Sequence, residues 1–206
     1  MIIPRWLDWA REIQALAQTG SHFAENEYQL QRYQRLIEIS AEIVTEYTSL
    51  EYPTVFTAFS SPIGYTTPRV DVRGVVFQDA RLLLVRERMD GGWTLPGGWA
   101  DVGEIPSIAA EREVWEEAGF QVKAKKVIGV YDANRIGRLE LFHAYKIVFL
   151  CDLISGEAKT SQETSDVAFF GRSELPEILS GERTKFRHIQ DAFYCQDNPN
   201  CITFFD

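Results

Sequence analysis

Residues 97–120 read GGWADVGEIPSIAAEREVWEEAGF, which places glycines first and a run rich in carboxylates after them. Pro106 suits the first turn of a helix, because the N–H that proline lacks has no partner there, and Gly119 suits the position just past a helix end. The stretch therefore predicts a glycine-rich loop, a helix of about three to four turns and a glycine stop. Apolar residues spaced by four are expected to form the buried side of that helix: Ala110, Val114 and Ala118.

Three carboxylates are expected on one face of this helix. Glu113, Glu116 and Glu117 are spaced i, i+3 and i+4, which places them about one turn apart. Like charges so close destabilise a helix, and a bound divalent cation would offset the repulsion. Mg²⁺ takes oxygen ligands, so the backbone carbonyl of Gly97 fits such a site, and the planar fork of Arg112 could orient Glu113. The alternative is a solvated acidic face that binds no ion.

These positions resemble the signature box of the Nudix hydrolases. The chain matches every fixed position of that box: Gly98, Glu104, Arg112, Glu113, Glu116, Glu117 and Gly119. The resemblance implies an α/β fold, the Nudix α/β/α sandwich with a mixed sheet. It also implies a pyrophosphohydrolase that uses Mg²⁺ or Mn²⁺ to cleave a nucleoside diphosphate linked to another moiety.

The resemblance also implies roles for single residues. The metal would be held by Gly97, through its carbonyl, and by Glu113, Glu116 and Glu117. Glu104 and Arg112 would brace the loop and the helix. Nudix members place the general base either in the box or on a later loop, so Glu113 and Glu163 are both candidates. Glu163 could instead be a more distant ligand or an ordinary surface carboxylate. The candidate catalytic residues are therefore Arg112, Glu113, Glu117 and Glu163.

The composition is that of a globular protein, with 206 residues of which 45% are hydrophobic and 25% are charged. The formal net charge of −9 disfavours non-specific binding to nucleic acid, because both would be negatively charged. For the same reason the ends of RNA are a less favoured substrate. Cys151, Cys195 and Cys201 are odd in number and contain no CxxC pair, which argues against a disulfide framework and a zinc site. With no signal peptide and no uncharged apolar run, a cytoplasmic protein without a membrane partner is expected.

The first 50 residues are expected to form a helical hairpin. Apolar residues recur at helical spacing over residues 3–19, a run that Thr19-Gly20 would end, and again from about Glu27 to Tyr47. The second helix carries two apolar stripes, which is more than one partner helix needs. The surplus would be buried in a homodimer through these helices or against the chain's own catalytic domain. Residues 51–68, rich in proline, serine and glycine, are expected to be a linker with little regular structure.

The catalytic domain is expected over residues 69–206. The sequence predicts strands at Val70–Phe77, Leu82–Val85, Val122–Tyr131, Leu139–Leu150 and Val167–Phe170, with a turn at residues 155–157. It predicts helices from Ser173 to about Ser180 and from Phe186 to Tyr194. The apolar tail from Asp197 is expected to pack onto this domain.

Arg73, Trp99 and His143 are the candidates for contacts with substrate. Alternation along the first strand puts Asp71 and Arg73 on one face, where Arg73 could reach a phosphate or merely pair with Asp71. Trp93 and Trp99 flank the glycine loop, where they could stack on a base or serve as ordinary packing. His143 lies in a predicted strand, where a hydrogen-bonded structural role is more common than an acid or base role.

The substrate itself is the least constrained expectation. The hairpin followed by residues 68–73, Pro-Arg-Val-Asp-Val-Arg, resembles a Nudix subgroup that includes CDP-choline pyrophosphatases. This favours CDP-choline or a similar CDP-alcohol, which would yield CMP and a phospho-alcohol. ADP-ribose hydrolases of the family usually carry a proline shortly beyond the box, and none lies between Pro106 and Pro176. A non-catalytic ligand sensor is the alternative of another class, but such proteins commonly lose box carboxylates, and this chain keeps them.

Overall fold

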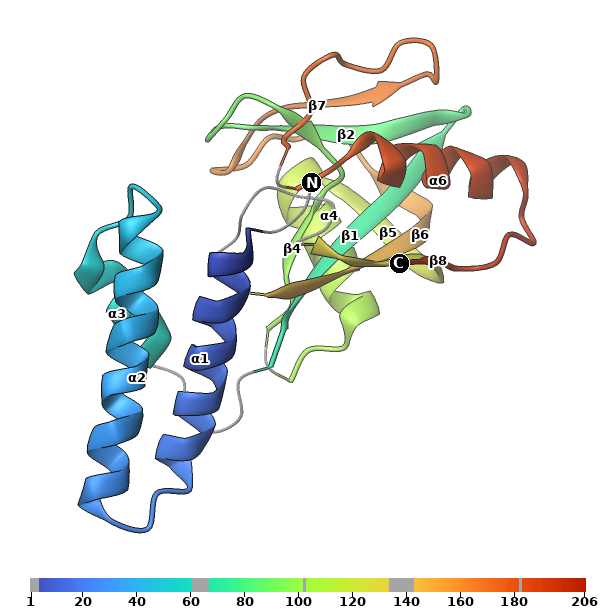
Figure 1. Ribbon diagram of the computed structural model, residues 1–206. Coiled ribbons are helices and arrows are strands. Elements are labelled where there is room, and N and C mark those ends of the chain that lie inside the picture. The colour runs from blue at the N-terminus through green and yellow to red at the C-terminus, as the bar shows by residue number, and fades with distance from the viewer. Residues whose placement is uncertain (1–3, 61–66, 102, 134–142, 182) are drawn as a thin grey trace. The chain divides into compact units, whose positions relative to one another are not determined.

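The computed structural model describes residues 4–60, 67–101, 103–133, 143–181 and 183–206 (Figure 1). The chain divides into two compact units, one formed by the described residues up to Pro68 together with His143, and one formed by the remainder from Arg69 on. Within these ranges, no helix is both long enough and apolar enough to cross a membrane.

The first unit is built on two long helices, α1 (Arg5–His22) and α2 (Glu27–Glu46). Asn26 caps α2 by accepting a hydrogen bond from the N–H of Gln29 at 2.9 Å. Helix α1 continues through Gly20, so the prediction that Thr19-Gly20 ends it is wrong. A Cβ at Gly20 would lie 2.3 Å from the ring of Tyr33 on α2, so this glycine lets the two helices approach closely.

A third helix, α3 (Tyr52–Ser60), occupies most of the segment expected to be an irregular linker. Pro53 lies in its first turn, where proline is tolerated, rather than acting as a breaker. Val55 and Phe59 lie one turn apart and are buried in the same apolar cluster as Leu7 and Val44 of the hairpin. The expectation of little regular structure is therefore wrong for residues 52–60, because their apolar spacing completes the core of this unit.

The second unit contains an eight-stranded mixed sheet with the strand order β3-β2-β1-β6-β5-β8, in which β4 also pairs with β1 and β7 with β2. Its strands are β1 (Arg69–Gln78), β2 (Arg81–Glu87), β3 (Trp93–Thr94), β4 (Gly97–Trp99), β5 (Phe120–Asp132), β6 (Ala144–Gly156), β7 (Thr164–Phe170) and β8 (Phe204–Phe205). The β1–β6 and β5–β8 pairs are parallel, and the other pairs are antiparallel.

One helix covers each face of this sheet: α4 (Pro106–Ala118) and α6 (Phe186–Asp197) (Figure 1). Val72 and Val76 of β1 pack in one apolar cluster with residues of α4, whereas Val75 packs in a second cluster with residues of α6. The side chains of successive residues of β1 thus point to opposite faces of the sheet. The predicted α/β/α sandwich with a mixed sheet, preceded by N-terminal helices, is confirmed.

Several elements differ in extent from the sequence prediction. Strand β6 continues through Gly156, where a turn was expected, and it begins at Ala144; residues 139–142 of the predicted strand lie outside the described residues. The helix predicted from Ser173 to Ser180 does not form. The residue before Pro176 is disfavoured in a helix, and the backbone of residues 178 and 180 pairs with Trp93 instead.

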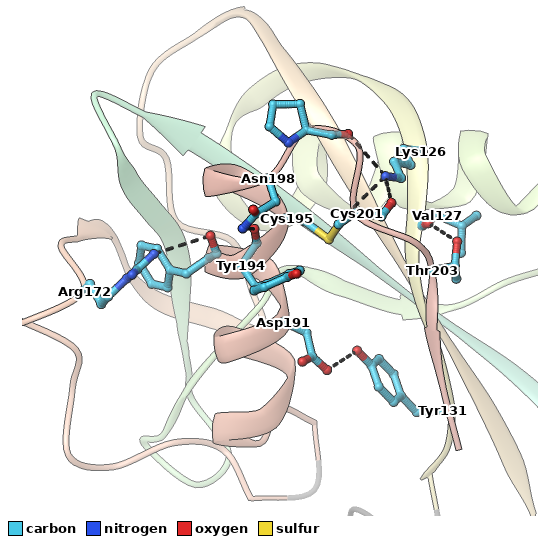
Figure 2. Close-up of a disulfide and its surroundings, with 12 residues drawn as sticks. Lys126, Val127, Tyr131, Arg172, Asp191, Tyr194, Cys195, Asn198, Cys201 and Thr203 are labelled. Atoms are coloured by element: carbon cyan, nitrogen blue, oxygen red, sulfur yellow. Dashed lines mark hydrogen bonds between the residues drawn. A yellow bond between two sulfur atoms is a disulfide. The ribbon is translucent and has the colours of Figure 1, made fainter.

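The C-terminal tail is joined to α6 by a disulfide between Cys195 and Cys201, drawn in Figure 2. A turn in which the N–H of Cys201 donates to the carbonyl of Asn198 at 2.8 Å brings the two cysteines together. The expectation of no disulfide is thus wrong for this pair, because the turn that brings Cys195 and Cys201 together is not encoded in the number or the spacing of the cysteines. Cys151 is free and buried. The expected packing of the tail occurs through β8.

Candidate active site

Strand β4 carries the glycines of the box along β1. Gly97 pairs with Arg73 and Gly98 with Val72 in an antiparallel register. Gly97 has a φ of +148°, and a Cβ there would lie 2.0 Å from the carbonyl oxygen of Val72. A Cβ on Gly98 would lie 2.9 Å from Oε1 of Glu113. Glycine is therefore required at Gly97, where a side chain would meet the backbone of β1, whereas a side chain at Gly98 would displace the carboxylate of Glu113.

Helix α4 begins and ends where the sequence predicted. Pro106 occupies its first turn, and Gly119, in a left-handed conformation with φ 79°, donates its N–H to the carbonyl of Trp115 at 3.0 Å. The apolar side of α4 faces the sheet, where a Cβ at Gly74 of β1 would lie 2.3 Å from a methyl group of Val114. This close packing fixes the position of the glutamates of α4 relative to β1 and β4.

The three glutamates of the box differ in their surroundings. Glu117 is 4% exposed, and its Oε2 accepts a hydrogen bond of 2.8 Å from the backbone N–H of Gly97. The side chain of Glu113 is 13% exposed, whereas that of Glu116 is 55% exposed. Because the three residues share one side of α4, the carboxylates form a row from the glycine loop to the surface.

Arg112 connects α4 to the loop before it. Its guanidinium donates to the two carboxylate oxygens of Glu104 at 2.8 and 3.0 Å, and its Nη1 donates to Glu113 and to Glu116 at 2.9 Å each. Arg112 therefore offsets part of the repulsion among the glutamates even without a bound metal ion. The ion pair between Arg112 and Glu104 joins the loop to α4, as the predicted bracing role of these two residues would require.

Burial changes the proton affinity of the inner carboxylates. It raises the pKa of Glu117 from 4.5 to about 7, against the opposing effects of Arg73 and of the Gly97 N–H. Burial likewise raises the pKa of Glu113, although Arg112 lowers it. Ionisation of Glu117 is therefore less favourable in the protein alone than in water, and a nearby cation would favour it.

Glu87, the last residue of β2, is a further carboxylate that the sequence analysis did not single out. It is 2% exposed, and its Oε1 pairs with Nη1 of Arg183 at 2.8 Å. Burial raises the pKa of Glu87, and the charge of Glu163 adds to the increase. The charge of Glu87 in turn adds to the raised pKa of Glu117. Glu87 therefore belongs to the acidic surroundings of the box.

Glu163 comes from the segment just before β7. Its carbonyl accepts a hydrogen bond of 2.9 Å from the N–H of Arg88, and the hydroxyl of Thr164 donates to the carbonyl of Glu117 at 2.8 Å. The structure thus brings this later segment to the end of α4, with the exposed side chain of Glu163 close enough to Glu87 to influence it. Which residue serves as the general base stays a prediction.

Arg73 is not available to a substrate. Its side chain is 3% exposed, and its Nε and Nη2 donate to the two oxygens of Asp71 at 2.8 and 2.9 Å. Its Nη1 donates to the carbonyl of Leu95 at 3.1 Å, and Lys146 donates to Asp71 at 3.0 Å. The predicted phosphate contact is therefore wrong. Asp71 and Arg73 do pair, but they do so under α6, on the buried face that they share with Val75.

The other substrate candidates are placed differently. Trp99 is 44% exposed, with the guanidinium of Arg69 5.8 Å from its ring centre, so a stacking role stays a prediction. Trp93 packs against Phe170 with ring centroids 4.7 Å apart, which is a structural role. His143 lies just before β6, so the expectation that it lies within a strand is wrong, and its contact with substrate stays a prediction.

The oxygen donors of the box suit a divalent cation. Each hydrogen bond given above for Glu113, Glu116 or Glu117 uses a single oxygen of the carboxylate, and Mg²⁺ and Mn²⁺ prefer oxygen ligands. Among the residues that the structure describes, no three acidic, histidine or cysteine side chains lie in an arrangement that could hold a metal ion. An ion held by all three carboxylates would therefore require their side chains to change conformation.

Two family models match the chain. One, described as a UDP-X-like, N-terminal oligomerisation domain, matches residues 4–59, and the NUDIX domain matches residues 67–194. Nudix hydrolases generally need divalent metal ions.

Similar proteins extend this match to nearly the whole chain. YjhB of Bacillus subtilis, which carries the provisional name of an ADP-ribose pyrophosphatase, is 34% identical over 203 residues, covering 98% of this chain and 97% of its own. The crystal structure of an ADP-ribose pyrophosphatase from Streptococcus suis matches with a TM-score of 0.62 and 33% identity, over 68% of this chain and 100% of that one. A crystal structure of UDP-X diphosphatase matches with a TM-score of 0.63 and 28% identity over 98% of both chains. The chain therefore belongs to the Nudix family and is a hydrolase of the pyrophosphatase type.

Proposed function

We propose that the protein uses Mg²⁺ or Mn²⁺ to hydrolyse the phosphoanhydride of a nucleoside diphosphate linked to another moiety. The observation that carries this proposal is the row of Glu113, Glu116 and Glu117 beside the backbone of Gly97, which offers only hard oxygen donors. A divalent ion bound there would lower the pKa of a water molecule and neutralise charge on the phosphoryl oxygens. Addition of water across the P–O–P linkage then gives a nucleoside monophosphate and a phosphorylated second product.

Each residue has a definite part in this proposal. Glu113, Glu116, Glu117 and the Gly97 carbonyl are the metal ligands, and either Glu113 or Glu163 accepts the proton of the attacking water. Arg112 keeps Glu113 and Glu116 in place through the ion pairs at 2.9 Å. The side chain of Trp99, half exposed at the end of β4, is the proposed surface for a base to stack on.

For the substrate we place ADP-ribose and UDP-linked compounds before CDP-choline. Proteins similar over nearly the whole chain are named for ADP-ribose and for UDP-X. CDP-choline, expected from the hairpin, has no such support, although it stays within the same chemical class. The cytoplasm stays the proposed location, because such nucleotide derivatives are made there.

A substrate panel tests this proposal directly. ADP-ribose, UDP-sugars, CDP-choline, NADH and capped RNA would be incubated with the protein and Mg²⁺ or Mn²⁺, followed by phosphatase-coupled phosphate release. We expect at least one nucleoside diphosphate derivative to be hydrolysed only when metal is present, and EDTA to stop the reaction. Metal-independent hydrolysis, or turnover of capped RNA alone, would contradict the proposal.

We also propose a homodimer through the N-terminal helices. Large apolar side chains on α1 and α2 are more than half exposed, among them Trp9 at 51%, Leu16 at 65% and Tyr28 at 63%. The description of the matching N-terminal domain as an oligomerisation domain supports the same interpretation.

Light scattering tests this assembly. The protein should have twice its chain mass of 23.6 kDa at micromolar concentration, and Leu16→Glu should shift it to the monomer because a charge would be buried in the interface. Glu177→Gln, a change at an exposed position outside the N-terminal helices, is the control. A wild-type monomer would support burial of this surface within one chain instead.

A further inference from the structure

Arg183 lies among the carboxylates around the box and, unlike Arg112, has no part in the roles given above. Its Nη1 pairs with Oε1 of Glu87 at 2.8 Å. The two partners differ sharply in exposure, since the side chain of Glu87 is 2% exposed and that of Arg183 is 27% exposed. The pair therefore anchors one nitrogen of the guanidinium on a buried acid while the rest of Arg183 is partly open to solvent.

The backbone beside Arg183 is fixed to the strand that leads into the glycine loop. The hydroxyl of Thr184, fully buried, lies 2.8 Å from that of Thr94 and accepts a hydrogen bond of 3.0 Å from the N–H of Leu95. Leu95 is two residues before Gly97, the proposed carbonyl ligand. The position of Arg183 is thus tied to the same backbone that positions the box glycines.

The turn before Arg183 is held on the neighbouring loop as well. The N–H of Ser180 donates to the carbonyl of Trp93 at 2.8 Å, and its hydroxyl donates to Asp90 at 2.9 Å. A Cβ on Gly92 would lie 2.4 Å from the nitrogen of Ser180, so only glycine permits this approach. Ser180 and Thr184, on either side of Arg183, are therefore both held to the backbone of residues 93–95.

The charges around Arg183 and the geometry of its guanidinium indicate which ligand it could bind. Its partner Glu87 lies near Asp90, Glu117 and Glu163, all acidic. Arg183 is the paired cation of this buried carboxylate, and Arg73 is a second cation that acts on it, so Arg183 should keep its bond to Glu87 while substrate binds. A guanidinium has five N–H donors in a planar fork, and the donors not directed at Glu87 match the spacing of phosphate oxygens.

We propose that Arg183 is a substrate-binding residue whose remaining N–H groups bind the pyrophosphate oxygens, and that Glu87 is the positioning residue that holds its fork in place. This inference rests on the proposed function, because the ligand is the diphosphate of that substrate class. It adds to the site a cation from outside the box, and it accounts for a buried glutamate at the end of β2.

Pyrophosphate binding tests the inference without requiring the true substrate. Isothermal titration of the full chain with inorganic pyrophosphate and Mg²⁺ should give a dissociation constant that rises at least about tenfold in Arg183→Ala. Arg183→Lys, which keeps the charge but loses the fork, should fall between the two proteins. Millimolar guanidinium should restore binding to Arg183→Ala without changing its thermal unfolding in the absence of pyrophosphate, whereas for a merely structural ion pair guanidinium would restore lost thermal stability as well.

The control is Arg81→Ala. Arg81 lies at the end of β2 opposite to Glu87, and its Nη2 pairs with Oε2 of Glu174 at 2.7 Å. The control variant should leave the affinity for pyrophosphate unchanged and show no response to guanidinium. Thermal unfolding of each variant confirms that it is folded.

Each outcome separates the inference from the proposed function. Pyrophosphate binding that depends on Arg183 would support the inference even if no panel compound were hydrolysed. No binding by the wild type, or equal binding by wild type and Arg183→Ala, would overturn the inference while leaving metal-dependent hydrolysis standing.

Discussion

Glu117→Gln should abolish turnover and at the same time stabilise the metal-free protein at alkaline pH. Because burial raises the pKa of Glu117 from 4.5 to about 7, the unfolded chain releases this proton between those values while the folded protein retains it. The stabilising effect of the protonated side chain is therefore full below pH 4.5 and is lost as the pH rises to 7, a loss of about 3 kcal/mol in the free energy of unfolding. Glutamine carries no charge and avoids the loss. Urea unfolding in EDTA should show similar stabilities at pH 4.5 and a more stable variant at pH 8.

Glu116→Gln is the matched control, because Glu116 is another proposed ligand on the same turn but its side chain is 55% exposed. It should lower turnover without stabilising the metal-free protein at pH 8. The double variant, Glu116→Gln with Glu117→Gln, should lose about a thousandfold or more in turnover, since metal stabilisation of the transition state is worth several kcal/mol. A folded double variant with undiminished activity would overturn the metal mechanism, and a Glu117→Gln protein no more stable than wild type would overturn the role given to burial.

Local signals made the core of the site predictable from the sequence. The limits of α4 follow from Pro106 and Gly119, and the shared face of Glu113 and Glu117 follows from helical spacing alone. The sandwich followed from the same stretch through its family resemblance. Neither the limits of α4 nor the shared face of its glutamates depends on how distant parts of the chain meet.

The features that the sequence did not predict are of two kinds. Some depend on contacts between residues distant in the sequence, and one depends on where the alternating pattern of a strand ends. Glu87 continues the alternation of Leu83 and Val85 on the face toward α4, but β2 was ended too early to include it. Its partner, Arg183, is far from Glu87 in the sequence, and no local pattern around either residue predicts their ion pair. The Cys195–Cys201 disulfide likewise depends on a turn that cysteine spacing does not encode.

Arg73 shows how the same alternation can mislead. It correctly placed Asp71 and Arg73 on one face, but it could not show that α6 covers that face or that Lys146 of the parallel strand β6 lies opposite Asp71. Burial by itself raises the pKa of Asp71, but the charges of Arg73 and Lys146 outweigh it and hold that pKa below its ordinary value. The ionised carboxylate therefore stabilises the fold at all but acid pH, and its contribution is lost as the pH falls through the lowered pKa.

Asp71→Ala should accordingly destabilise the protein by about 3–5 kcal/mol in urea unfolding at pH 7, because it leaves the buried cations of Arg73 and Lys146 without their shared carboxylate. Adding Lys146→Met should recover part of this loss by removing one unpaired charge. The control is Glu174→Ala, which breaks the pair with Arg81 whose side chains are 46% and 56% exposed, and it should change stability by less than about 1 kcal/mol. Equal effects of Asp71→Ala and Glu174→Ala would mean that the cluster under α6 is solvated in solution, because only an unsolvated charge makes the loss of its partner this unfavourable.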